Sequence, residues 1–184
     1  MPGICLTFDN DTKQIINQIY QKVNNKLGPV LKIDENLEPH FTLLHHSSNI
    51  DIGDKTSLYS KIDNLANQFS KNIIKIEGYG IFQRGDNCIL YLSTPYNTRF
   101  QEIHKKAWEI FGNYSFRKEH YHYSSFIPHL TIPLINQNID TAMQVLKELI
   151  NEGLVNIVLN NTKIGYLTAN LDSPEVYYSK ELAQ

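Results

Sequence analysis

Apolar residues in this chain recur every second residue in some segments and every third or fourth residue in others, the spacings of strands and of amphipathic helices. Short apolar runs between polar or turn residues predict the strands, and longer segments that end near glycine predict the helices. Asp11 or Thr12 is expected to cap the first helix. The predicted strands are residues 4–8, 40–44, 73–82, 88–93, 129–135, 155–160, 163–169 and 176–182, and the predicted helices are residues 12–27, 54–69, 98–111 and 139–152.

The order of these predicted elements repeats along the chain, and so do parts of its sequence. The segment PHFTLL, which contains His40, recurs 89 residues later as PHLTIP, which contains His129. Gly78-Tyr79 recurs 87 residues later as Gly165-Tyr166. We therefore predict an α+β fold in a single domain, residues 1–184, made of two intertwined, pseudo-symmetric lobes that flank a central cleft.

Each of the two repeated segments places a histidine and a threonine on one face of a strand. Side chains at i and i+2 of a strand share a face, so His40 lies beside Thr42, and His129 lies beside Thr131. Phosphodiester cleavage takes a proton from the attacking oxygen and gives one to the leaving oxygen, and two imidazoles with pKa near ~6.5 can do both around neutral pH. Threonine hydroxyls can donate hydrogen bonds to phosphate oxygens. These four residues are therefore the candidate catalytic site.

The segments PHFTLL and PHLTIP resemble the two His-x-Thr signatures of the 2H phosphoesterase superfamily, which includes LigT-like 2′-5′ RNA ligases, cyclic phosphodiesterases and 2′,5′-phosphodiesterases. The resemblance covers nearly the whole chain, because the strand order and the lobed repeat also match. It implies a bilobed α+β fold with antiparallel sheets beside the cleft. It also implies that His40 and His129 act as general base and general acid, in an order that the sequence leaves open, and that Thr42 and Thr131 hold the phosphate.

Weaker candidates lie outside the motifs, among them aromatic residues that could stack on a base and an arginine that could contact a second phosphate. His46 has the strand parity of His40 and could lie at the cleft edge, although solvent exposure is the simpler interpretation. His120 and His122 form an HxH pair without accompanying acidic or cysteine ligands, so we expect no metal and no other cofactor. The substrate-binding candidates are Arg84, Tyr121, Tyr123 and Phe126, together with Phe8 and Tyr166, which the resemblance implies because similar positions in the family line the cleft.

Composition and charge narrow the choice of partners. The chain has 184 residues, a net charge of −2 and a pI of about 6.4, which disfavours a protein that coats long nucleic acid. Cys5 and Cys88 lie in apolar runs and are expected to be small buried residues. No apolar run approaches the ~20 residues of a membrane span, and MPGICLTFDN lacks the pattern of a signal peptide. We expect a cytoplasmic monomer with a small nucleotide or oligonucleotide as its partner, no membrane contact and no obligate protein partner.

Functions of three classes fit these observations. The first is a metal-independent phosphodiesterase acting on a 2′,3′-cyclic phosphate or a 2′-linked (2′-5′) diester of RNA, a small oligonucleotide or a cyclic or oligonucleotide signal, such as one made in antiviral defence. The alternative is a catalytically silent module that keeps the fold and senses a nucleotide. A third is a protein–protein scaffold with an incidental cleft. Both His-x-Thr motifs are intact, which favours the enzyme.

Overall fold

Four α-helices and one antiparallel sheet form an α+β fold in the computed structural model, which describes residues 3–27, 38–46, 55–85, 87–95, 97–114, 126–132, 138–153, 155–170 and 173–183. The helices are α1 (Asn10–Leu27), α2 (Lys55–Asn67), α3 (Thr98–Phe111) and α5 (Ile139–Asn151), and the 3₁₀ turn η2 (Gly112–Tyr114) follows α3. The strands are β1 (Gly3–Phe8), β2 (Phe41–His45), β3 (Asn72–Glu77), β4 (Tyr79–Arg84), β5 (Asn87–Ser93), β6 (His129–Thr131), β7 (Asn156–Asn170) and β8 (Ser173–Glu181).

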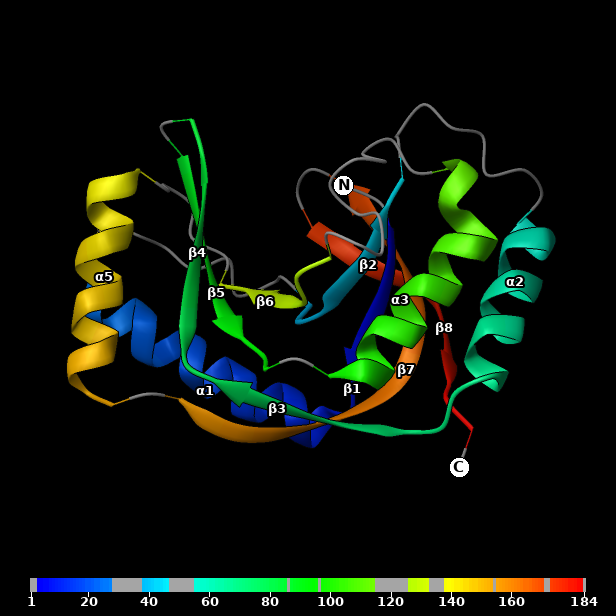
Figure 1. Cartoon of the computed structure of the whole chain (residues 1–184), viewed down its shortest axis with the longest axis horizontal. Coiled ribbons are helices and arrows are strands. Elements are labelled where there is room, and N and C mark those ends of the chain that lie inside the picture. The colour runs from blue at the N-terminus through cyan, green and yellow to red at the C-terminus, as the bar shows by residue number, and fades with distance from the viewer. Residues whose placement is uncertain are drawn as a thin grey trace.

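Figure 1 shows how these elements are arranged around the middle of the sheet. Helix α5 and strands β4 and β5 stand at one end, and helices α2 and α3 and strand β8 stand at the other. Strands β3 and β7 run between the two ends along one side. The short strands β2 and β6 lie between the ends, so both His-x-Thr segments occupy the centre of the fold.

The predicted kinds of element and their order are confirmed, and the differences lie at boundaries. The predicted strand over residues 73–82 is two strands, because Gly78 adopts a φ of 81°, a left-handed conformation that glycine accepts at little cost. The two strands predicted over 155–160 and 163–169 are one continuous strand, β7. Asp9, rather than Asp11 or Thr12, caps α1, since the backbone N–H of Thr12 donates to the Asp9 carboxylate over 2.8 Å.

Strand pairing places the two repeated segments next to each other. The order across the sheet is β3-β7-β1-β2-β6-β5-β4, with β8 beside β7. Strand β2 meets β6 where Phe41 pairs with Leu130, two residues that hold the same place in the repeat, 89 residues apart. In an antiparallel pair, a contact between equivalent residues relates the two strands by an approximate twofold axis. The two motifs therefore face each other symmetrically.

The pairing also corrects one part of the predicted repeat. Cys5 of β1 pairs with the first motif strand, and Tyr91 of β5 pairs at the same place with the second motif strand. On the next strand outward, Cys5 pairs with Gly165 and Tyr91 pairs with Gly80. Gly165 therefore corresponds to Gly80, not to Gly78 as the shared Gly-Tyr dipeptide predicted. The difference of two residues preserves strand parity, so the side chains assigned to each face of the sheet do not change.

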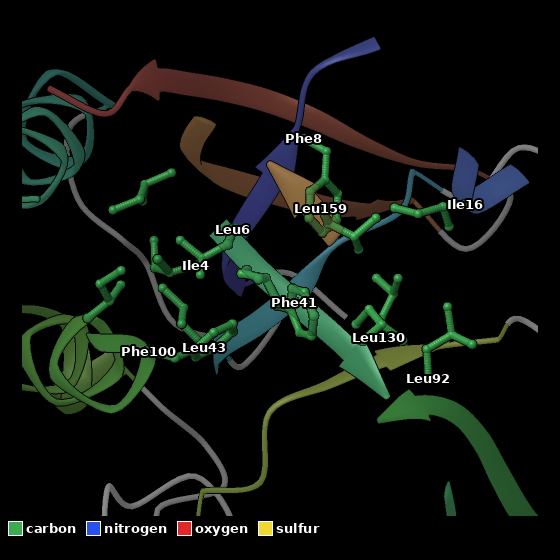
Figure 2. Packing of buried hydrophobic residues seen from close by; sticks show 14 of the residues in the cluster. Ile4, Leu6, Phe8, Ile16, Phe41, Leu43, Leu92, Phe100, Leu130 and Leu159 are labelled. Carbon is green, nitrogen blue, oxygen red and sulfur yellow. The ribbon is translucent and has the colours of Figure 1, made fainter. Parts of the chain in front are cut away.

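The hydrophobic core covers one face of the central strands and fixes their orientation. Every second side chain of β1 points into it, and Phe41 of β2 and Leu130 of β6 join them (Figure 2). Phe41 contacts Phe8 and Phe100 edge-on, with ring centroids 5.8 Å and 4.9 Å apart. Burial of each such side chain stabilises the fold by roughly 1.5–3 kcal/mol. The alternate residues of the same strands must then lie on the opposite face.

The structure corrects the prediction for His46, because β2 contains a bulge. Ile4 pairs with Leu44 and Cys5 with Thr42, so β2 contains one extra residue against β1, and the strand parity reverses beyond it. His46 therefore points into the core, where it is fully buried, and its ring lies 5.6 Å from that of Tyr166. The predicted place at a cleft edge and the exposed alternative are both wrong. The two cysteines are buried, as predicted.

Acidic solution is expected to destabilise the fold through His46. Burial lowers the pKa of His46 from 6.5 to about 4, so between these values the unfolded chain binds a proton that the folded chain does not. Stability should therefore be lost as the pH falls through this window, by roughly 2 kcal/mol between about pH 7 and pH 5. Urea unfolding of the wild type and of His46→Leu at both pH values tests this expectation.

The matched control is Phe111→Leu, which alters the packing around His46 without removing a titratable group. This variant should be less stable at both pH values and keep the wild-type pH dependence. His46→Leu should lose the roughly 2 kcal/mol that His46 contributes and keep the part due to His40, whose pKa burial also lowers. A pH dependence that is the same in His46→Leu as in the wild type would contradict the assignment.

Candidate active site

The four motif residues lie on the face of the sheet opposite the core. Phe41 and Leu130 are fully buried, whereas the residues on either side of each are only partly buried. Because Phe41 pairs with Leu130 in an antiparallel register, the neighbouring positions place His40 opposite Thr131 and Thr42 opposite His129. The two imidazoles thus lie diagonally across a strand pair, each with a threonine opposite it. The structure brings all four predicted residues together.

Both imidazoles are held by the same local hydrogen bond. His40 Nδ1 donates to the backbone carbonyl of Glu38 over 2.7 Å, and His129 Nδ1 donates to the carbonyl of Ile127 over 2.8 Å. A carbonyl oxygen can only accept, so Nδ1 carries the proton in each neutral ring. The Nε2 atom therefore bears the lone pair in both rings, and it is the nitrogen that can take up or release a proton in catalysis.

The electrostatic surroundings of His40 favour its neutral form. Burial lowers the pKa of His40 most, and a charge on His129 lowers it further, while the hydrogen bond and the charge of Glu38 raise it. Glu38 is itself paired with Lys13, whose Nζ lies 2.5 Å from the carboxylate. A neutral imidazole with Nδ1 protonated is ready to accept a proton at Nε2.

Two aromatic side chains beside His129 were not predicted from the sequence. Phe82 of β4 lies 4.9 Å from the His129 ring, and Tyr91 of β5 lies 5.6 Å from it. The two aromatic rings stack on each other at 4.3 Å and are only partly buried. Tyr91 alternates with the core residues Leu90 and Leu92, so its parity places it on the motif face. That parity is the sequence signal that could have identified it.

Two buried groups support the motif strands. The hydroxyl of Tyr20, in α1, donates to the backbone carbonyl of Thr131 over 2.8 Å, and burial raises the pKa of this tyrosine. The thiol of Cys5 lies opposite Thr42 and donates to the carbonyl of Gly165 over 3.4 Å. Burial raises the pKa of Cys5 to about 12, so the thiol stays protonated and fills space as a small neutral group.

Three of the predicted substrate-binding residues belong to the core instead. Phe8 has the parity of Ile4 in β1 and packs edge-on against Phe41. Tyr166 lies opposite Ile4 and is 7% exposed, so its ring points to the same core face. Phe126 stacks on His104 at 3.7 Å. In all three cases the ring completes the hydrophobic layer beneath the motif face.

The remaining sequence candidates have no described side chain. Tyr121, Tyr123, His120 and His122 lie outside the described residues, and only the backbone of Arg84 is described, at the end of β4. Within the described ranges, no three His, Cys, Asp or Glu side chains gather closely enough to hold a metal ion. In the same part of the chain, no helix combines the length and the apolar character that crossing a membrane requires.

Comparison with known proteins identifies the class of the chain. A family model described as the 2′-5′ RNA ligase superfamily matches residues 12–165, a range that includes both His-x-Thr motifs. The chain therefore belongs to the 2′-5′ RNA ligase superfamily, the 2H phosphoesterases, as the resemblance of its motifs predicted. No curated protein matches the sequence.

Solved structures show that the fold is LigT-like. The protein TT0787 of Thermus thermophilus is 14% identical, with a TM-score of 0.65 over 98% of this chain and 97% of the other. Escherichia coli LigT in complex with 3′-AMP is 11% identical, with a TM-score of 0.62 over 100% and 98%. Usb1 of Kluyveromyces marxianus is 14% identical, with a TM-score of 0.53 over 98% and 97%. The predicted fold class is confirmed.

Removal of the Tyr20 hydroxyl is expected to weaken the strand that carries the second motif. Tyr20→Phe leaves the Thr131 carbonyl without this buried donor, which should lower the free energy of unfolding by about 1–3 kcal/mol. Urea unfolding measures the loss. Tyr178→Phe is the matched control, because its hydroxyl donates to the Asp63 carboxylate at a less buried place, and its loss should be smaller. A Tyr20→Phe protein as stable as the wild type would disprove the support role.

Proposed function

We propose that this protein is a metal-independent phosphodiesterase that uses His40 and His129 for general acid–base catalysis. Its substrate would be a 2′,3′-cyclic phosphate or a 2′-linked (2′-5′) diester in RNA, a small oligonucleotide or a nucleotide signal, with a messenger of antiviral defence as one instance. The observation that supports this most directly is the pair of imidazoles at the start of two paired strands, each held at Nδ1 by the same local hydrogen bond. Membership of the phosphoesterase superfamily supports it as well.

The proposed reaction needs one proton acceptor and one proton donor. His40 Nε2 takes a proton from the attacking water or hydroxyl as its oxygen bonds to phosphorus. His129 Nε2, protonated at the start, gives its proton to the oxygen that leaves as its bond to phosphorus breaks. The lowered pKa of His40 supports the assignment of the base. Thr42 and Thr131 donate hydrogen bonds to the non-bridging oxygens, where negative charge grows in the transition state.

Small nucleotides are the proposed substrate class. Structures of Escherichia coli LigT, the fold neighbour with 11% identity, contain 3′-AMP and, in others, ATP and phosphate. The net charge of −2 also suits a small substrate better than a long nucleic acid, whose binding depends on many cationic contacts. We further propose one domain of two intertwined lobes, acting as a monomer in the cytoplasm. The alternative, a nucleotide sensor without turnover, would bind the same ligands and release no product.

Replacement of either histidine should abolish most activity. General acid–base catalysis contributes about 10²–10⁴-fold to the rate, so His40→Ala and His129→Ala should each lower kcat by a factor in this range. The measurement is turnover of a panel of 2′,3′-cyclic nucleotides and of 2′-5′ and 3′-5′ oligonucleotides, with products separated by chromatography. EDTA should leave the wild-type rate unchanged, and a loss that a divalent ion restores would contradict the metal-independent mechanism.

The control for these two variants is His45→Ala, which removes an imidazole from the end of β2, outside the first motif. It should retain wild-type turnover. Full activity in either His40→Ala or His129→Ala would refute the mechanism. Tight nucleotide binding by a wild-type protein that forms no product would favour the sensor.

The pH dependence of kcat/KM should report His40 in the free enzyme. A base is active when it is neutral, so activity falls as the pH falls through the pKa of His40, which is lowered below 6.5. The negative charge of Glu38 raises this pKa, so Glu38→Gln, which keeps the carbonyl that holds Nδ1, should move the acidic limb to lower pH. Glu77→Gln, an exposed carboxylate paired with Lys75, is the control. A limb that moves to higher pH in Glu38→Gln would exclude His40 as the base.

A further inference from the structure

The surroundings of the two histidines differ, although the motifs themselves are symmetrical. Strand pairing shows which residues correspond on the two sides: Tyr91 corresponds to Cys5 beside the motif threonines, and Gly80 corresponds to Gly165 one strand outward. The same register, 85 residues apart, relates Phe82 to a buried leucine, Leu167. One side of the motif pair therefore carries two aromatic rings, and the other carries a thiol and an aliphatic side chain.

The two aromatic side chains, Phe82 and Tyr91, form a surface that we call the aromatic wall. Their rings stack on each other at 4.3 Å, and Phe82 meets the ring of His129 nearly at a right angle, at 4.9 Å. Both rings remain partly exposed. Gly80 makes this arrangement possible, because a Cβ at that position would lie 2.2 Å from the Tyr91 ring. Glycine thus lets the tyrosine lie directly over the backbone of β4.

We propose that the aromatic wall binds the base of the substrate's nucleoside, so that the nucleoside enters on the side of His129. The proposal rests on the proposed function and names the orientation of the substrate in that site. Aromatic side chains stack on bases of any sequence, because every base presents a π face. The corresponding positions on the side of His40 hold Cys5 and Leu167, neither of which has a ring that could stack on a base.

This orientation accounts for the proposed roles of the two histidines. In a nucleoside 2′,3′-cyclic phosphate, the oxygen that leaves phosphorus belongs to the ribose. A base on the aromatic wall brings that ribose to the side of His129, whose Nε2–H can protonate the leaving oxygen. Water then attacks phosphorus from the side of His40, which accepts the water proton. One P–O bond forms and one breaks, the proton taken by His40 balances the proton given by His129, and exchange with solvent restores both rings.

The proposal is tested with two substrates that differ only in the base. Adenosine 2′,3′-cyclic phosphate carries a base, and the 2′,3′-cyclic phosphate of methyl riboside carries a methoxy group in its place. The wild type should favour the adenosine compound in kcat/KM by about fivefold to a hundredfold, the range expected for stacking of one base. Phe82→Leu and Tyr91→Leu should each reduce this preference, mainly by raising KM for the adenosine compound.

A matched control separates this effect from general loss of aromatic packing. Tyr59 and Tyr178 stack at 4.0 Å between α2 and β8, away from the motif strands, and Tyr59→Leu should keep the full preference. If the wild type turns over both compounds equally and the histidine variants are inactive, the aromatic wall does not bind the base, and the proposed function stands. Because this ratio is measured on the wild type, the test does not depend on whether the leucine variants fold.

If neither compound is turned over, the proposed function fails for this substrate class. Calorimetry then tests whether the aromatic wall binds a base. Binding of 3′-AMP should be at least about fivefold tighter than binding of ribose 5-phosphate, and the difference should be lost in Tyr91→Leu. Equal binding of the two phosphates would overturn the proposal.

Discussion

The pairing of Phe41 with Leu130 is the constraint on which the rest of the site depends. Both side chains are fully buried, and the core around them fixes which face of β2 and β6 points inward. A shift of either strand by one residue would turn its histidine and threonine into the core and bring apolar side chains to the other face. Hydrophobic packing on one side of the sheet thus determines the position of the polar groups on the other.

Each motif also carries its own means of orienting the imidazole. The carbonyl that holds Nδ1 belongs to the residue two positions earlier in the chain, Glu38 for His40 and Ile127 for His129. This bond is local, so duplicating the segment duplicates the hydrogen bond at Nδ1 and the tautomer that it sets. Long-range contacts are then needed only to bring the two copies together. The sheet supplies these contacts through β2 and β6, and the Tyr20 hydroxyl adds one from α1.

Sequence reasoning found the parts of this protein that depend on local periodicity. The helices, most strands and the shared face of each His-Thr pair follow from spacings of two and of three to four residues. The predicted position of His46 was wrong, because the bulge beside Leu44 reverses strand parity and has no recognisable sequence pattern. Sequence reasoning misplaced Phe8, although the parity that this residue shares with Ile4 already indicated the core. It missed Phe82, whose place beside His129 depends on the register of three strands.

A symmetrical pair of catalytic groups cannot by itself assign two different tasks. Acid and base catalysis require one neutral and one protonated imidazole, so something outside the motifs must distinguish them. Here the differences lie in the neighbours: burial and Glu38 act on His40, whereas Phe82 and Tyr91 lie against His129. The repeat therefore supplies two equivalent imidazoles on the same face of paired strands. The residues that have diverged around them set the direction of the proposed reaction. Exchanging those neighbours, rather than the histidines, is the change that would reverse it.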